Sequence, residues 1–342
     1  MNMLKRPIGL WFIVALVVLM ALAGCSQGAT GTETEQAAKS EAVTKIESTE
    51  KSVETEGADE TKVSQGGKRI VTDMMGREVQ VDNTIERVAV LMPSDAEILY
   101  ALDKGDLIVG RGTYVDYPEA VLSAPTVATG DDLNLEEIMA LDPQVVIMTT
   151  MGKNDNQLAS MEEAGLSVYL TDAKTIDEVY TAIEHLGELV GAEENATDLI
   201  QEMKETFDKY TALAAEQEEK TVYYEISPLE FGLWTGGSGS FMNEIGSMLN
   251  LKNIFSDVDG WGEVSAEQVL ERNPDYIITT SMYMGQGPTP EEEIMQREGW
   301  KDVQAVVDAH VYSANSDEFT RPGPRLINAI ETLYTKIYGP AQ

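Results

Sequence analysis

Short apolar runs alternate along most of the chain with segments whose apolar residues recur every three or four positions. The runs RVAVLM (from Arg87), LIVGRG (from Leu107) and VVIM (from Val145) are typical of buried strands. The intervening segments have the period of helices, and Ser94 with Glu97 has the spacing of a capping box at a helix start. This alternation predicts an α/β fold in which helices cover parallel sheets.

The strand pattern is interrupted between Thr175 and Glu219. Thr175 and Glu178 form a capping box, after which one helical apolar stripe runs to a break at Gly191 and a second stripe follows. We therefore expect two lobes, each a mostly parallel β-sheet flanked by helices, joined by a long rigid α-helix. The predicted boundaries are an N-terminal lobe over residues 69–173, a bridging helix over 174–219 and a C-terminal lobe over 220–342. Such a bridge predicts modest closure of the cleft rather than a large swing.

One sequence pattern occurs once in each lobe. NLEEIMALDPQVVIMTT begins at Asn134 and SAEQVLERNPDYIITTS begins at Ser265. Each has a capping residue, a Glu two places on, a Pro at one shared offset and then an apolar run, which places Glu136 and Glu267 in the first turn of two helices. A carboxylate there stabilises a helix by about 0.3–1 kcal/mol, which is a purely structural explanation. The functional alternative is that both Glu side chains project from the cleft-side surface of their lobes.

The beginning of the chain has the pattern of an export signal. Lys5 and Arg6 precede an apolar run that ends in small residues, which predicts a signal peptide over residues 1–24. The segment LAGC resembles a lipobox, in which Cys25 is lipidated and becomes the first mature residue. Cys25 is the only cysteine, so a disulfide within one molecule and thiol catalysis in the folded part are excluded. Because large apolar side chains are scarce after it, we expect a disordered acidic stalk over residues 25–68.

Composition narrows the partners and the chemistry. The net charge of −35 argues against nucleic acid or an anionic membrane surface as a partner, although a local pocket can oppose the overall field. His185 and His310 are isolated, so neither a metal site nor a resident cofactor is expected. No Ser–His–Asp motif is visible either. The stretch TGGSGSF lacks the Lys of a phosphate-binding loop and predicts a turn capped by Ser240 instead.

Seven stretches, in order, carry a family resemblance: DMMGREVQV, RVAVLMPSDAEILYAL, VGRGTYVDYPEAV, NLEEIMALDPQVVI, GSGSFMNEIG, GWGEVSAEQVLERNPDYII and EFTRPGPRLINAIETL. With the lipobox and the mid-chain helix, they resemble class III substrate-binding lipoproteins of ABC importers, the group that includes receptors for cobalamin, haem and iron–siderophore complexes. The resemblance extends over residues 69–338. It implies a monomeric binding protein, not an enzyme. The lipobox predicts a lipid tether to the cell membrane, and the long acidic stalk favours a one-membrane envelope with the protein on its outer face. Its ligand would be a cobalamin-like corrinoid or an iron chelate (siderophore or haem), and its partner an ABC permease dimer with its ATPase.

The same resemblance implies docking residues. In such proteins one exposed Glu on each lobe pairs with Arg on the two permease subunits, which here assigns Glu136 and Glu267. Glu137 is the alternative on the first lobe and Glu263 on the second.

Aromatic residues on loops suggest the ligand pocket, since such side chains suit a broad planar ligand. Tyr114, Tyr117, Trp234 and Trp261 occupy such positions. The resemblance matches Trp261, and either Tyr114 or Tyr117, with pocket residues of cobalamin receptors. A structural alternative is that Tyr117, beside Pro118, packs its own loop.

Two charged residues near the end of the chain complete the implied site. Asp317 and Arg321 match positions that contact ligand in cobalamin-type receptors, and Arg321 would also suit a carboxylate or a phosphate. Arg325 has the alternative of pairing with an acidic neighbour. One departure from the cobalamin pattern is ATGDDLN, where Asp131 and Asp132 would suit a cationic or polar ligand.

Other readings stay open at this point. Haem ligation is compatible with five side chains: Tyr114, Tyr117, His310, Met92 and Met151. Two other classes of function are an envelope enzyme that acts on a chelate and a surface adhesin or sensor.

Overall fold

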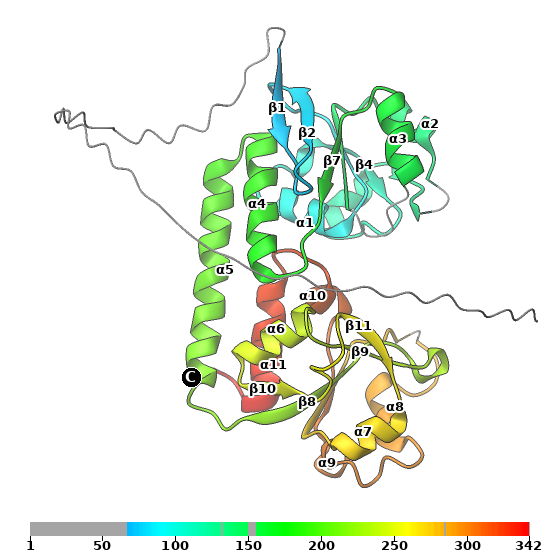
Figure 1. Cartoon of the computed structure of the whole chain (residues 1–342), viewed down its shortest axis with the longest axis vertical. Coiled ribbons are helices and arrows are strands. Elements are labelled where there is room, and N and C mark those ends of the chain that lie inside the picture. The colour runs from blue at the N-terminus through cyan, green and yellow to red at the C-terminus, as the bar shows by residue number, and fades with distance from the viewer. Residues whose placement is uncertain (1–66, 131–132, 150–154, 284, 342) are drawn as a thin grey trace, which may run out of the picture. The chain divides into compact units, whose positions relative to one another are not determined.

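The N-terminal half of the folded chain is built on a five-stranded parallel sheet (Figure 1). The computed structural model describes residues 67–130, 133–149, 155–283 and 285–341, all within one unit that extends from Asp59 to Gln342. The strand order is β5-β4-β3-β6-β7, and every pairing is parallel. The strands are β3 (Val88–Val90), β4 (Ile108–Gly112), β5 (Thr126–Val127), β6 (Val145–Thr149) and β7 (Val168–Thr171). An antiparallel hairpin of β1 (Lys68–Thr72) and β2 (Glu78–Asp82) precedes them.

Both faces of this sheet are buried. Along β6, Val145 and Ile147 belong to one apolar cluster whereas Val146 and Met148 belong to another. The first cluster also contains residues of α1 (Pro93–Ala101) and α4 (Ile176–Val190), and the second contains residues of α2 (Leu135–Ala140) and α3 (Asp155–Glu163). Helices thus cover both faces, as a parallel sheet requires. We call elements β1–β7 with α1–α3 the N-lobe.

Helix α1 begins differently from the prediction. It begins at Pro93, with Met92 as its N-cap residue, and no side chain caps it. The predicted capping box of Ser94 and Glu97 is therefore wrong. Proline is well suited to the first helical position because the N–H it lacks has no partner there, and this start places both residues inside the helix. The helix is buried from Pro93 to Leu99, so the Glu97 carboxylate needs a partner elsewhere.

The second half of the chain repeats the architecture with a four-stranded parallel sheet, order β10-β8-β12-β13. Its strands are β8 (Lys220–Glu225), β10 (Leu251–Asn253), β12 (Tyr276–Thr279) and β13 (Val311–Ser313). A separate antiparallel pair joins β9 (Leu233–Gly236) to β11 (Trp261–Val264). The helices are α6 (Phe241–Met248), α7 (Ala266–Arg272), α8 (Pro290–Gln296), α9 (Gln304–Val307), α10 (Ser316–Thr320) and α11 (Leu326–Tyr338). We call these elements the C-lobe. Ser240 caps α6, as predicted.

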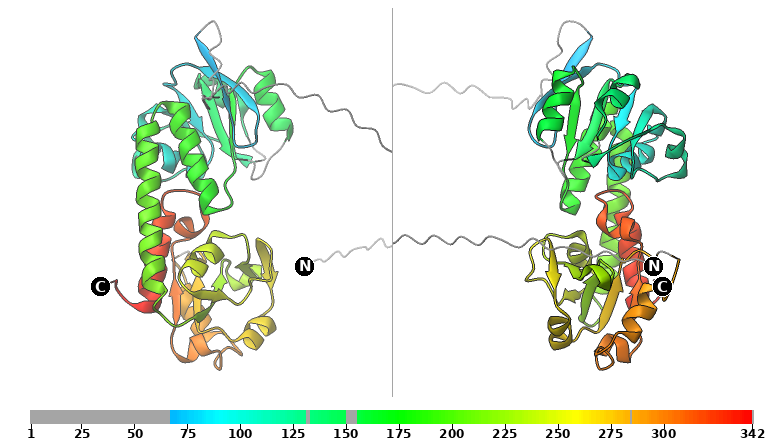
Figure 2. Two further views of the ribbon diagram at one scale, coloured as in Figure 1. Left: turned by 60° about the vertical axis from the view of Figure 1, so that its left-hand side comes forward. Right: turned by 90° about the vertical axis from the view of Figure 1, so that its right-hand side faces the viewer.

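Two helices, rather than one, occupy the segment between the lobes. α4 ends at Gly191, whose φ of 67° is left-handed, and α5 (Glu193–Ala214) follows, so the predicted break is confirmed. α4 contacts α1 of the N-lobe, whereas α5 contacts both α4 and α11 of the C-lobe (Figures 1 and 2). At Gly187 the two helices approach so closely that an added Cβ would lie 2.6 Å from the Cβ of Ala196. Helix α5 is thus the element that connects the lobes.

The apolar core is continuous through α5. Met203 and Phe207 of α5 belong to the same cluster as Leu186 of α4 and Leu333 of α11. A well-packed interface on both sides resists relative motion, because interiors are as dense as molecular crystals. This packing is the physical basis for a stiff bridge. No helix in the described ranges combines the length and apolar character needed to cross a membrane.

The doubled sequence pattern forms the same unit in both lobes. Asn134 caps α2 by accepting from the N–H groups of Glu136 and Glu137, and Ser265 caps α7 by accepting from Gln268. The residue before each shared Pro, Asp142 or Asn273, is left-handed, with φ of 48° and 44°. Such a residue ends a helix and redirects the chain into the buried strand that follows, β6 or β12.

Candidate functional site

A cavity of about 590 Å³ lies between the two lobes. Its walls come from chain segments that follow β3, β4 and β5 in the N-lobe and β8 and β12 in the C-lobe, with β11 and α10 beside them. Ligands of open α/β sheets bind at such carboxyl ends of parallel strands. The lining residues are Leu91, Met92, Pro93, Ser94, Tyr114, Thr129, Gly130, Ile226, Trp261, Thr280, Ser316, Thr320, Arg321 and Pro322.

Two of the predicted aromatic residues line this cavity from opposite lobes. Tyr114 follows β4 and is 73% exposed, and Trp261 begins β11 and is 43% exposed. Gly236 pairs with Trp261 in the β9–β11 ladder, and a Cβ there would lie 3.0 Å from Cζ3 of the indole. A glycine at that position leaves room for the ring. The two rings place apolar surface on both walls of the cavity.

The other two aromatic residues lie elsewhere. The ring of Tyr117 stacks on the guanidinium of Arg325, whose Cζ is 4.2 Å from the ring centroid, and Tyr117 is not among the lining residues. The structure thus places Tyr114, not Tyr117, at the cavity. Trp234 does not line it either, but it lies on the same face of the β9–β11 pair as Trp261, because paired residues and alternate positions share a face.

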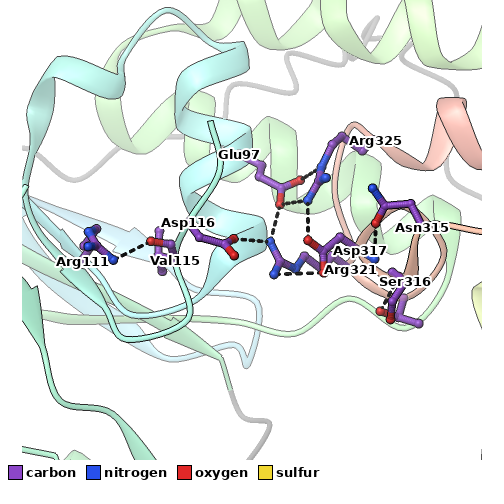
Figure 3. A network of polar contacts seen from close by, with 10 residues as sticks. Glu97, Arg111, Val115, Asp116, Asn315, Ser316, Asp317, Arg321 and Arg325 are labelled. Atoms are coloured by element: carbon purple, nitrogen blue, oxygen red, sulfur yellow. Dashed lines mark hydrogen bonds and ion pairs between the residues drawn. The ribbon is translucent and has the colours of Figure 1, made fainter. Parts of the chain in front are cut away.

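Arg321 is the predicted charged residue that lines the cavity, and three carboxylates from both lobes surround it (Figure 3). Its Nη1 lies 3.1 Å from Oε1 of Glu97 and 3.1 Å from Oδ1 of Asp116, both in the N-lobe. Its Nη2 lies 3.0 Å from Oδ1 of Asp317 in the C-lobe. Asp317 is not itself a lining residue, so its contact here is with arginine.

Arg325 completes this ionic cluster, which consists of Glu97, Asp116, Asp317, Arg321 and Arg325. Its Nε donates to Oε2 of Glu97 at 2.8 Å and its Nη2 to Oε1 at 2.6 Å, and Nη2 also lies 3.5 Å from Oδ2 of Asp317. Burial lowers the pKa of Arg325, but hydrogen bonds and charge from Glu97, followed by the charge of Asp317, raise it further than burial lowers it. The net result is a raised pKa, and the cation is retained.

Comparison with known proteins shows the family of the chain. Residues 88–318 match the model of the family described as periplasmic binding protein.

The chain belongs to the periplasmic binding protein family.

Relatives of this periplasmic binding protein match it over most of its length. It is 30% identical over 342 residues to the uncharacterized ABC transporter substrate-binding lipoprotein YvrC of Bacillus subtilis, covering 98% of both chains. It is 29% identical over 251 residues to the vitamin B12-binding protein of Vibrio cholerae, covering 73% of this chain and 88% of that one. A solved structure of a possible iron-binding (periplasmic solute-binding) protein from Staphylococcus epidermidis gives a TM-score of 0.66 at 32% identity, covering 75% of this chain and 100% of that one.

These findings confirm the family resemblance and the two-lobed α/β fold. The molecule is a periplasmic binding protein of the ABC importer type. The relatives named above are substrate-binding proteins, in agreement with a function in binding rather than in catalysis.

The two glutamates proposed for docking occupy equivalent exposed positions. Glu136 and Glu267 each lie in the first turn of a short helix, α2 or α7. Hydrogen bonds from the backbone at Glu267, and then from the Ser265 hydroxyl, lower the pKa of the Glu267 carboxyl, which keeps it charged. Of the alternatives, Glu137 accepts a 3.5 Å hydrogen bond from the N–H of Ala128, and Glu263 is exposed on β11 opposite Trp234.

The two histidines have structural contacts. Nδ1 of His185 lies 3.1 Å from the Tyr169 hydroxyl, and the His310 ring stacks on Tyr276 with a centroid distance of 4.5 Å. Within the described ranges, no three His, Cys, Asp or Glu side chains are grouped so that they could hold a metal ion. Of the side chains considered for haem, Tyr114 and Met92 line the cavity. Cys25, Asp131, Asp132 and Met151 lie outside the described residues.

Sequence reasoning missed three residues at the site: Glu97, Asp116 and Thr280. Glu97 and its arginines are separated by 224 and 228 positions, so no local spacing could reveal the pairing. Asp116 lies inside the stretch TYVDYP, where the neighbouring tyrosines are the more prominent feature. Thr280 follows β12, lines the cavity and is only 4% exposed, and its buried hydroxyl has no hydrogen-bond partner within the described part of the chain.

Proposed function

We propose that this periplasmic binding protein captures a corrinoid or an iron chelate in the inter-lobe cavity and delivers it to an ABC permease with its ATPase. The observation that carries the proposal is the pairing of Tyr114 and Trp261 on opposite walls of a cavity of about 590 Å³. That volume falls within the usual range for small-molecule sites, and exposed aromatic side chains contributed by both lobes suit a broad, rigid ligand.

The names of the relatives support the same ligand class. The Vibrio cholerae relative is named as a vitamin B12-binding protein, and the Staphylococcus epidermidis structure as a possible iron-binding protein. Neither name distinguishes corrinoid from iron chelate for this chain.

The continuous core through α5 supports capture with little rearrangement. A stiff bridge keeps the two lobes, and with them Glu136 and Glu267, in nearly one relative position. We propose that these two carboxylates pair with arginines on the two permease subunits, since fixed charges on both lobes suit recognition of a two-fold partner. No feature of the described residues favours an envelope enzyme or an adhesin over this function.

The predicted export and anchoring signals fit this function. A signal peptide over residues 1–24 and lipid on Cys25 would place a monomeric receptor outside the cell membrane, on the outer face of a one-membrane envelope. The acidic stalk over residues 25–68 would give it reach to its permease.

The test is a visible absorption spectrum of the mature chain carrying Cys25→Ser. The protein is mixed with cyanocobalamin, haemin or ferric hydroxamate, separated from free ligand by gel filtration, and scanned. Because the three chromophores absorb differently, a retained ligand identifies itself. Stoichiometric retention of a corrinoid or an iron chelate supports the proposal, and retention of none of the three overturns the ligand class.

A further inference from the structure

The ionic cluster beside the cavity carries an excess of negative charge. Arg321 is the only described lining residue with a charged side chain. Around it, Glu97, Asp116 and Asp317 supply three negative charges against the two positive charges of Arg321 and Arg325. The positive charge of Arg321, which would otherwise attract an anionic ligand, is therefore already balanced by these carboxylates in the protein without a ligand.

The donors of Arg321 are already used. Its Nη1 is shared between carboxylates of Glu97 and Asp116, and its Nη2 faces Asp317, all within 3.1 Å. An anion that approached this guanidinium would meet three carboxylates at close range. Charges in a partly desolvated cleft interact more strongly than in water, so this repulsion is not negligible.

We propose that the cavity selects ligands without net negative charge, namely an uncharged or cationic corrinoid or iron chelate, and discriminates against anionic ones. This inference rests on the proposed function and names the charge class of its ligand. An anion buried in the cleft needs a compensating cation, and the described lining residues offer none that is unpaired. An uncharged ligand avoids that penalty, and a cation is attracted by the net charge of the cluster.

Displacement of one carboxylate would not reverse this balance. The Asp116 side chain is 61% exposed and is free to turn toward solvent, which would release one contact of Arg321. Glu97 is fixed, because its side chain is 2% exposed and is held by both arginines. With Asp116 turned away, two carboxylates still oppose two guanidiniums, and no net positive charge is available to an anion.

An unpartnered hydroxyl on the C-lobe wall agrees with a polar, uncharged ligand. The Thr280 Oγ1 is buried and has no hydrogen-bond partner within the described residues. Leaving such a group unpaired is unfavourable, so a rotation of this side chain toward a ligand amide or hydroxyl would gain a hydrogen bond that the unliganded protein lacks. Neutral amide groups meet this requirement without adding charge.

The test compares ligand pairs that differ in charge but share one scaffold. Cyanocobalamin is compared with its monocarboxylic acid, in which one amide is replaced by a carboxylate. Ferrioxamine B, which is a cation, is compared with its neutral N-acetyl form and its anionic N-succinyl form. Binding to the mature Cys25→Ser chain is measured by quenching of tryptophan fluorescence at 0.15 M salt. We expect the carboxylate member of a bound scaffold to have a Kd about tenfold higher than its neutral partner, as one partly screened charge pair predicts.

Two variants locate the origin of the preference. Asp116→Asn should lower the ratio of the Kd of the carboxylate ligand to that of its neutral partner by about two- to five-fold, the size expected for a partly exposed ion pair. Asp198→Asn removes the same charge from the exposed surface of α5 and should leave the ratio unchanged. A carboxylate ligand that binds as tightly as its neutral partner overturns the inference and leaves the proposed function standing. An unchanged ratio in Asp116→Asn overturns the assignment to this cluster, and failure of every scaffold to bind overturns the proposed function itself.

Discussion

Glu97 and Arg325 join the two lobes through a pair of hydrogen bonds, from Nε to Oε2 at 2.8 Å and from Nη2 to Oε1 at 2.6 Å. The carboxylate is on α1 of the N-lobe and the guanidinium directly precedes α11 of the C-lobe. This two-point geometry fixes both distance and orientation, which a single contact does not. The same carboxylate also holds Arg321, so one buried side chain positions both arginines beside the cavity.

Glu97→Gln should destabilise the protein. The substitution keeps the shape of the side chain but removes the charge that two partly buried arginines share, and breaking a buried pair costs about 3–5 kcal/mol. Because the arginines retain some solvent contact, we expect a loss in the free energy of unfolding at the low end of that range. Urea unfolding followed by circular dichroism measures it. Glu86→Gln, on an exposed residue, is the control and should change stability by less than about 0.5 kcal/mol.

Trp261→Ala should weaken ligand binding much more than Trp234→Ala. Both indoles lie on the same face of the β9–β11 pair, but only Trp261 lines the cavity. Loss of a central aromatic contact costs about 2 kcal/mol or more, which corresponds to a roughly thirtyfold rise in Kd. Isothermal titration calorimetry with the bound ligand compares the two variants. Equal losses would contradict the placement of the site at Trp261.

The predictable part of this fold is the part that local pattern determines. The alternation of apolar runs, the break at Gly191, the capping box at Thr175 and the doubled unit at Asn134 and Ser265 follow from spacing within a few residues. Each corresponds to a hydrogen bond or a buried face that neighbouring residues create. Such features need no knowledge of the rest of the chain.

The unpredictable part depends on residues far apart in sequence. Glu97 satisfied a local capping rule, yet it pairs with arginines more than two hundred positions away, and Pro93 moved the helix start so that the rule did not apply. The sequence alone does not distinguish Tyr114 from Tyr117 as the residue that lines the cavity. In the structure, Tyr114 lines the cavity, whereas Tyr117 stacks on Arg325, a residue of the other lobe that no local pattern links to it.

The contribution of Asp95 to the free energy of unfolding should decrease as the pH rises from about 4 to about 7. Burial raises the pKa of this carboxyl to about 7, while the hydrogen bond from Thr171 lowers it by less. Its value in the unfolded chain is near 3.8. Between these values the folded state holds the proton that the unfolded state has released, so this group's contribution to stability is present below about pH 4 and is lost as the pH rises toward 7.

The measurement is the free energy of unfolding at several pH values in the wild type and in Asp95→Asn. Asparagine resembles the protonated carboxyl, so the variant should lack this decline, which the linkage relation puts at roughly 4 kcal/mol between pH 4 and pH 8. Other acidic groups titrate in both proteins and cancel in the difference. A difference that does not change with pH would contradict the prediction.

The double variant Glu136→Arg with Glu267→Arg should reduce delivery at least tenfold while leaving ligand affinity unchanged. Both carboxylates are exposed and outside the cavity lining, so their reversal should cost each helix only about 1 kcal/mol or less and leave capture intact. Against the arginines proposed on the permease, the substituted arginines would place like charges together, at a cost of several kcal/mol. Ligand uptake and stimulation of the ATPase, measured with purified transporter in proteoliposomes, should fall at least tenfold. Glu137→Arg with Glu263→Arg is the matched control, and loss of transport in this variant alone would move docking to those residues.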